Sequence, residues 1–178
     1  GATVTACGGN GYDSYGIYAG GNVTVEGATV TASGGNGNAI EDYASYGIYA
    51  DGDVTVEDAD VTATGGKTGV YSYGIQAYEG GVTISGGTVK ATGGKAGGDS
   101  CGICADHGSI NISGGTVEAT GGEAGGSSYG IYGTYNTVLG AGGKTGVTIT
   151  GGNVTATGGK VSSDEAVSCG IYGSSGGV

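Results

Sequence analysis

The hexapeptide Ser14-Tyr-Gly-Ile-Tyr-Ala19 is the stretch of sequence that decides the fold. It returns unchanged at residues 45–50, and variants of it start at residues 72, 100, 128 and 168. A second phrase, typified by Val-Thr-Ala-Thr-Gly-Gly, recurs in step with it. Internal repetition at a period of about 30 residues is typical of solenoids and related arrays. We divide the chain into the units 1–26, 27–57, 58–85, 86–113, 114–150 and 151–178, with a loop insertion at 133–144.

Each unit reads as three short strands separated by turns. In the second unit we predict strands at 28–33, 46–50 and 53–57, because apolar and polar residues alternate there with the two-residue period of a half-buried strand. Gly-Gly closes the alanine- and threonine-rich strand of every unit, which predicts a sharp corner that uses the positive φ open to glycine. Helical periodicity is absent. One unit therefore predicts one coil of a right-handed parallel β-solenoid, the hand being that of most parallel crossovers.

Equivalent residues of successive coils are expected to stack about 4.8 Å apart. Strict alternation places Tyr46 and Ile48 on one face of their strand and Tyr49 on the other. The predicted inward ladder takes one isoleucine from each unit: Ile17, Ile48, Ile75, Ile103, Ile131 and Ile171.

Charge supports the same register. Lys90 lies one unit before Glu118, and Lys95 lies one unit before Glu123. Residues one unit apart become neighbours in a solenoid, so each pair is expected to bring opposite charges together. The repeat register is therefore predicted by polar as well as apolar positions.

Composition excludes several classes of protein. Glycine provides 47 of the 178 residues without a collagen-like period of three, and the net charge is -11. An acidic chain with five basic residues is a poor ligand for nucleic acid, and no apolar run reaches membrane-spanning length, so we expect neither nucleic acid binding nor membrane insertion. We expect an extracellular or cell-surface protein that is processed or part of a longer chain.

Two phrases carry a resemblance to a known family. Gly-Gly-Thr-Val-Lys-Ala-Thr-Gly-Gly at 86–94 and Ser-Tyr-Gly-Ile-Tyr-Ala at 45–50 resemble the repeats of bacterial cell-surface parallel β-helix proteins of the adhesin-like and carbohydrate-binding-like type. The similarity covers all six units. It implies a β-helix architecture and placement at the cell surface.

The leading functional hypothesis is structural. Neither end of the chain shows a capping element, and the sequence stops in nearly the phase in which it starts. Uncapped coils can pair with further copies of the same chain, and a contact that does not close on itself produces a filament. We therefore expect copies of the chain to stack end to end, or the chain to form part of a longer surface array.

The first alternative is an adhesin or a carbohydrate-binding module. Its predicted contact face is an outward column interrupted by Gln76 and Cys104, next to a column of glycines. Such a face can stack polysaccharide rings, or it can serve only to stabilise its own sheet. The column consists of Tyr18, Tyr49, Tyr132 and Tyr172.

The second alternative is an ice-binding solenoid. Outward threonine pairs recur at 3/5, 29/31, 62/64 and 155/157. Asp60, Lys90 and Glu118 interrupt these rows, and threonine is in any case favoured in strands.

We predict no catalytic residue and no enzymatic activity. Cys101 and Cys104 have CxxC spacing, but residues i and i+3 of a regular strand face opposite sides, so the two thiols are not expected to converge. Together with Cys7 and Cys169 they are predicted to be free thiols. The chain has one histidine, His107, and the sequence pattern does not complete a catalytic group around it.

The sequence contains short patterns for glycosylation and acidic residues that are candidates for calcium binding. Asn22, Asn111 and Asn153 lie in Asn-x-Ser/Thr sequons and are possible glycosylation sites. No metal or organic cofactor is expected, apart from calcium at acidic residues that precede the Tyr-Gly-Ile strands. These residues are Asp13, Glu41, Asp42, Asp99, Asp164 and Glu165.

Overall fold

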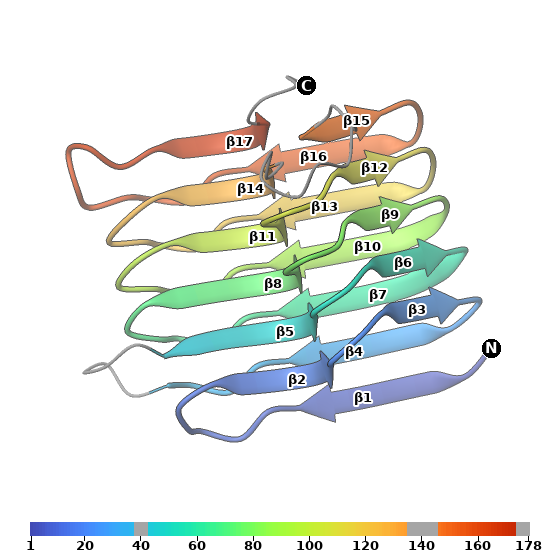
Figure 1. The fold of residues 1–178 in the computed structure, drawn as a ribbon, viewed down its shortest axis with the longest axis horizontal. Helices are drawn as coiled ribbons and strands as arrows, with labels where there is room; N and C mark the ends of the chain where they lie inside the picture. Colours follow the sequence, from blue (N-terminus) through green and yellow to red (C-terminus); the bar gives the residue numbers. More distant parts are fainter. Residues whose placement is uncertain (38–42, 135–145, 174–178) are drawn as a thin grey trace.

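A computed structural model describes residues 1–37, 43–134 and 146–173 of the chain. These residues form seventeen β-strands and no helix, and every strand pairing is parallel (Figure 1). The insertion predicted at 133–144 lies almost wholly outside the described residues, as do Glu41, Asp42 and the last five residues. In the described ranges, no helix has the length and apolar character needed to cross a membrane.

The strands belong to three sheets, which we name after their commonest residues. The threonine sheet contains β1 (Thr3–Cys7), β4 (Thr29–Ser33), β7 (Ala59–Thr64), β10 (Gly87–Thr92), β13 (Thr116–Thr120) and β16 (Asn153–Thr157). The tyrosine sheet contains β2 (Ser14–Ala19), β5 (Ala44–Ala50), β8 (Tyr71–Ala77), β11 (Ser100–Ala105), β14 (Ser128–Gly133) and β17 (Ser168–Gly173). The valine sheet contains β3 (Val23–Glu26), β6 (Val54–Glu57), β9 (Val82–Ile84), β12 (Ile110–Ile112) and β15 (Val147–Ile149).

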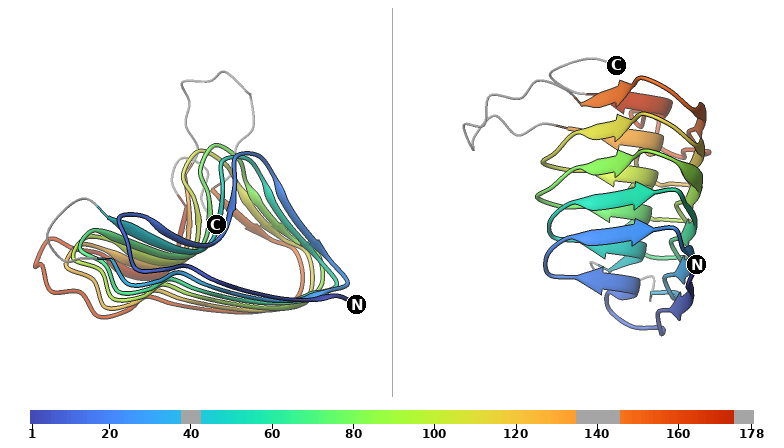
Figure 2. Two further views of the ribbon diagram at one scale, coloured as in Figure 1. Left: turned by 90° about the horizontal axis from the view of Figure 1, so that it is seen from below. Right: turned by 90° about the vertical axis from the view of Figure 1, so that its right-hand side faces the viewer.

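The chain visits the three sheets in turn and then rises by one level. Figure 2 (left) shows the threonine sheet along one side of the cross-section and the other two sheets closing it, and the path turns clockwise away from a viewer at the N-terminal end. The structure is thus a right-handed parallel β-solenoid, as predicted. Two sheets have six strands and the third has five among the described residues, so one repeat unit forms one level.

The register stacks equivalent residues of successive units. Ile48 pairs with Ile17 on one side and with Ile75 on the other, and the pairing continues through Ile103 and Ile131 to Ile171. The four middle isoleucines are fully buried, whereas Ile17 and Ile171 pack against the core at its two ends. Valine, alanine and isoleucine of all three sheets fill the remaining interior. Small and β-branched side chains suffice because the space between the sheets is thin.

Both predicted charge pairs are ion pairs across neighbouring strands. Lys90 Nζ lies 3.3 Å from Glu118 Oε2, and Lys95 Nζ lies 2.6 Å from Glu123 Oε1. All four side chains are at least half exposed, so water and salt screen the pairs strongly. The two ion pairs are good evidence for the register, but they contribute little to the stability.

The Gly-Gly corners serve a different purpose from the one predicted. None of their residues has a positive φ, which occurs instead at the entry to the threonine sheet: Gly27, Asp58, Gly87, Gly115 and Gly152. Glycine is needed at the first position of each Gly-Gly pair because a serine of the next strand fits against it. A Cβ on Gly34, for example, would overlap Ser45 Oγ and the carbonyl of Tyr46.

That serine joins two levels of the coil. Ser45 donates its hydroxyl to the carbonyl oxygen of Gly35 at 2.8 Å and accepts the amide N–H of Gly66, one level higher, at 2.8 Å. Ser72 makes the same two bonds with Gly66 and Gly94. A fully buried hydroxyl is thereby satisfied as donor and acceptor at each internal level.

The tyrosine sheet departs from strict alternation at its central glycine. A Cβ on Gly74 would lie 2.6 Å from Thr92 N and 3.0 Å from Ala91 C, so this glycine faces the interior and the threonine sheet comes close to it. Ile75, the next residue, is also fully buried. Two consecutive inward residues shift the phase, as a β-bulge does. The residues before and after the Gly-Ile pair therefore both face outward.

This phase shift corrects one prediction. Tyr46 does not share a face with Ile48; its ring lies 4.9 Å from the ring of Tyr49, centroid to centroid, on the outer surface. Strict two-residue alternation was the wrong rule for this strand, because the close approach of the two sheets turns the glycine inward.

Candidate functional site: a tyrosine-lined hollow

Each strand of the tyrosine sheet presents two outward positions, one on either side of its Gly-Ile pair. Stacking of the levels turns these positions into two columns on the outer face. The first column contains Tyr15, Tyr46, Tyr73, Cys101, Tyr129 and Cys169. The second column contains Tyr18, Tyr49, Gln76, Cys104, Tyr132 and Tyr172.

Tyrosines at neighbouring levels stack on one another. The rings of Tyr15 and Tyr46 are 4.9 Å apart and inclined by 5°, and those of Tyr18 and Tyr49 are 5.6 Å apart and inclined by 3°. Offset stacking at such distances is favourable for aromatic rings. Where the columns are complete, they thus form a continuous surface of rings.

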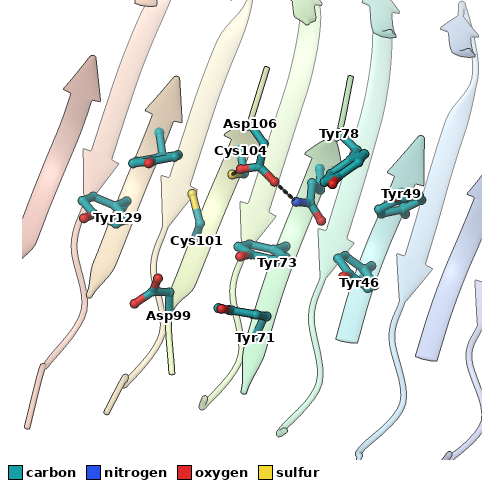
Figure 3. Close-up of a pocket in the computed structure, with 12 residues that line it drawn as sticks. Tyr46, Tyr49, Tyr71, Tyr73, Tyr78, Asp99, Cys101, Cys104, Asp106 and Tyr129 are labelled. Carbon is teal, nitrogen blue, oxygen red and sulfur yellow. Dashed lines mark hydrogen bonds between the residues drawn. The ribbon is translucent and has the colours of Figure 1, made fainter. Parts of the chain in front are cut away.

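The columns are interrupted where smaller side chains replace tyrosine. Gln76 takes the place of one ring in β8, and Cys101 and Cys104 take the place of both rings in β11. The result is a hollow of about 390 Å³ bounded by the rings of the levels above and below (Figure 3). Its lining consists of Tyr46, Tyr49, Tyr71, Tyr73, Gln76, Tyr78, Asp99, Cys101, Cys104, Asp106, Tyr129 and Tyr132.

The two cysteines of the CxxC sequence lie on the same outer face, which corrects the prediction that they point apart. Gly102 and Ile103 both face inward, so the bulge brings Cys101 and Cys104 to the floor of the hollow. Each of these two residues is only 1% exposed, and neither forms a disulfide bond. The hydrogen bond with Cys101 and burial together raise the pKa of the Cys104 thiol well above its usual range. A protonated, buried thiol is a poor nucleophile and a poor metal ligand.

A chain of hydrogen bonds runs along one side of the hollow. Gln76 Nε2 donates to Asp106 Oδ2 at 2.5 Å, and Cys104 Sγ donates to Asp106 Oδ1 at 3.1 Å. Both carboxylate oxygens are therefore engaged. Gln76 is 3% exposed, and its Oε1 is buried without a hydrogen-bond partner. An unpaired buried acceptor is costly, typically about 1–3 kcal/mol.

Five tyrosines of the hollow have phenols whose pKa is raised, so these phenols stay protonated well into the alkaline range. Burial raises the pKa of Tyr46, Tyr49, Tyr73 and Tyr129, and it raises the pKa of Tyr132 to about 12. Protonated phenols keep a hydroxyl donor and an electron-rich ring face. The lining thus offers aromatic faces, hydroxyl groups, two carboxylates and one unpaired amide oxygen.

The predicted contact column falls partly within this hollow. Tyr49 and Tyr132 line it, whereas Tyr18 and Tyr172 lie outside it at 57% and 38% exposure. Tyr73 and Tyr129 are equivalent to Tyr46, which strict alternation places on the inner face, so the sequence does not indicate them. The signal that could have found the site was the replacement of tyrosine by Gln76, Cys101 and Cys104 in adjacent units.

The three sequon asparagines are exposed and lie apart from the hollow. Asn111 is on the outer face of β12, Asn153 begins β16, and Asn22 lies in the turn before β3. Asn22 Oδ1 accepts the amide N–H of Asp53 at 2.9 Å. Glycosylation at these positions stays a prediction.

The remaining candidates do not assemble into a second site. Over residues 1–37, 43–134 and 146–173, no three His, Cys, Asp or Glu residues lie in a group that could hold a metal ion. Calcium binding by the acidic turns stays untested. His107 packs edge-on against Tyr78 with ring centroids 5.3 Å apart. The threonine rows meet Asp60 and Lys90 in the register of the threonine sheet, as the sequence indicated, and ice binding stays a prediction.

Comparison with known proteins supports the architecture. Residues 82–103, 110–131 and 147–177 match the family model described as a beta helix repeat. This match and the stacked parallel sheets both support a parallel β-helix built from repeats. Searches of curated proteins and of solved structures gave no match.

Proposed function

We propose that this chain is a non-enzymatic, extracellular carbohydrate-binding protein whose site is the tyrosine-lined hollow. The observation that carries the proposal is the combination of stacked tyrosine rings with the unpaired, buried Oε1 of Gln76. A pyranose ring has apolar C–H faces and a rim of hydroxyl groups. Aromatic side chains can cover the faces, and a well-placed acceptor can bind a hydroxyl.

Charge restricts the kind of sugar. Asp99 and Asp106 lie at the hollow, and the chain carries a net charge of -11. Like charges repel across a desolvated contact. Neutral or cationic sugars therefore fit the hollow better than uronic acids or sulfated glycans.

The same geometry argues for binding without catalysis. Glycoside hydrolysis generally uses two carboxyl groups that flank the scissile bond and act on it directly. Both oxygens of Asp106 already accept hydrogen bonds, and Asp99 Oδ1 accepts the amide N–H of Ser127 at 2.6 Å. The raised pKa of Cys104 removes a thiolate nucleophile. The two carboxylates and the thiol therefore stabilise the lining of the hollow through hydrogen bonds within the protein.

A glycan array followed by calorimetry tests the proposal. We expect neutral glycans to bind the wild-type protein, and Tyr132→Ala to weaken binding about fivefold, since one aromatic contact contributes about 1 kcal/mol. Tyr18→Ala is the matched control, because Tyr18 belongs to the same column but lies outside the hollow. Failure of every glycan to bind, or preferential binding of anionic glycans, would refute the proposal.

End-to-end association, the leading hypothesis from the sequence, stays a prediction. It depends on what adjoins the first and last coils, whereas the hollow consists of described residues in the middle of the solenoid. Sedimentation of the protein at increasing concentration tests it directly. Dispersed monomers at high concentration would exclude filament formation by this chain alone.

A further inference from the structure

The level of β11 is a slot in the face of tyrosine rings. Its floor consists of Cys101 and Cys104, the two outward residues of that strand. Tyr129 and Tyr132 of β14 form one wall, and Tyr73 and Gln76 of β8 form the other. Figure 3 shows Cys101 between Tyr73 and Tyr129, with Asp99 and Asp106 displaced toward opposite ends of the strand.

The slot is one ring thick. Stacked tyrosines at adjacent levels have centroids 4.9–5.6 Å apart, so each filled level holds one ring. The levels of Tyr73 and Tyr129 are separated by two strand spacings, which is about 9.6 Å. One flat ring inserted edge-on at the level of Cys101 would thus contact a tyrosine on each face.

The slot is also long enough for two rings in a row. Cys101 and Cys104 are three residues apart on a strand, which corresponds to about 10 Å along β11. At the Cys101 end a ring lies between two tyrosines. At the Cys104 end it lies between Tyr132 and Gln76, whose buried, unpaired Oε1 can accept a hydroxyl from it once the amide turns toward the slot.

We infer, as a refinement that rests on the proposed carbohydrate-binding function, that the slot holds a neutral, β-linked disaccharide unit whose substituents are all equatorial, lying edge-on along β11. Only such rings are flat and apolar on both faces, as two aromatic walls require. An axial hydroxyl would press a polar group against a tyrosine ring, where it would lose its hydrogen bonds to water. An α-linkage would bend the disaccharide out of a straight slot.

The ligand specificity of the wild-type protein is the first test. We expect cellotetraose to bind at least about tenfold more tightly than maltotetraose, which is α-linked, because an unsatisfied polar contact costs more than about 1 kcal/mol. We also expect cellobiose to bind more tightly than lactose, because lactose carries one axial hydroxyl. Equal affinity for the straight and bent sugars would overturn the inference, even if binding itself confirmed the proposed function.

Filling the slot is the second test. The double variant Cys101→Tyr, Cys104→Tyr restores both rings of the level, as at β2, β5 and β14, and we expect it to fold normally and to bind cellotetraose at least about twentyfold more weakly. Cys169→Tyr is the matched control, since it completes the first column at β17, outside the hollow. We expect it to bind as the wild type does.

Gln76→Leu keeps the test decisive if the double variant does not fold. This change keeps the side-chain volume and removes the acceptor, together with the donor to Asp106. We expect a loss of about five- to tenfold in cellotetraose affinity with an unchanged β-sheet circular dichroism spectrum. A folded, slot-filled protein that binds cellotetraose as the wild type does would place the sugar elsewhere on the tyrosine face. If the wild-type protein binds no glycan, the proposed function itself is refuted.

Discussion

The two lowest levels of the tyrosine sheet and the level of β11 have the same backbone and different surfaces. In β2 and β5 both outward positions hold tyrosine, and the rings stack into a closed face. In β11 both positions hold cysteine, and the face opens into the hollow. Strand pairing is the same in both regions, and each level contributes one inward isoleucine. A binding site can thus arise by removal of side chains from a regular scaffold, without a loop or an insertion.

Both regions depend on the phase shift at the central glycine of each strand. Gly74→Ala would disrupt that phase shift. A Cβ at this position would lie 2.6 Å from both Gly102 O and Thr92 N, and the backbone cannot yield without separating the two sheets. We expect the free energy of unfolding to fall by about 3 kcal/mol or more, because overpacking on this scale is poorly relieved. Urea unfolding followed by circular dichroism measures the loss.

Gly21→Ala is the control for this prediction. Gly21 lies in the turn before β3 and has no positive φ, and a Cβ at this position would meet no atom within 4 Å. We expect its effect to be within about 0.5 kcal/mol. Equal effects of the two substitutions would show that the inward glycine is not what sets the two columns.

The tyrosine face predicts a loss of stability at alkaline pH. Burial raises the pKa of Tyr15 and of Tyr132 to about 12, while a phenol of the unfolded chain titrates near about 10. The folded state therefore keeps protons that the unfolded state releases, so the stabilisation is complete below pH of about 10 and declines as the pH rises toward about 12. Urea midpoints across this range, with phenolate absorbance recorded in parallel, measure it.

Tyr15→Phe sharpens the alkaline experiment. Phenylalanine keeps the stack with Tyr46 and cannot ionise, so this variant should lose less stability between pH of about 10 and about 12 than the wild type does. An identical pH dependence of the two proteins would show that Tyr15 contributes nothing to the transition.

The smallest expected effect is on the opposite side of the solenoid. Lys90 and Glu118 lie in β10 and β13, which belong to the same two coils as β11 and β14. Because both side chains are more than half exposed, Lys90→Ala should lower the free energy of unfolding by about 0.5 kcal/mol or less and leave glycan binding unchanged. A change in affinity would indicate coupling between the threonine sheet and the hollow.

The repeat alone was sufficient to predict the architecture and the register. Ile48 and Ile75 occupy the same phase of successive units, and the opposite charges of Lys90 and Glu118 occupy another. In a solenoid every repeat contacts its neighbours in the same way, so one aligned position fixes all the others. This is why a sequence without a single phenylalanine or tryptophan could still be assigned to a fold.

The hollow could not be predicted in the same way. Its existence depends on Gly102 and Ile103 both facing inward, which follows from how closely the tyrosine and threonine sheets approach each other. That distance is a property of the packed coil and leaves no mark on the alternation of residues. The prediction therefore separated Cys101 from Cys104, and it treated the interruption at Gln76 as a defect of a column.

The serine at each level makes the coils interchangeable. Ser72 bonds to one glycine of its own coil and to one glycine of the next, and Ser45 does the same one level below. A duplicated or deleted coil would find the same hydrogen-bonding partners at its boundaries. Gain or loss of whole repeats in the gene could then move a binding pocket to another level of the solenoid. Duplication of the repeats that form the pocket could produce further copies at regular intervals, with the scaffold unchanged.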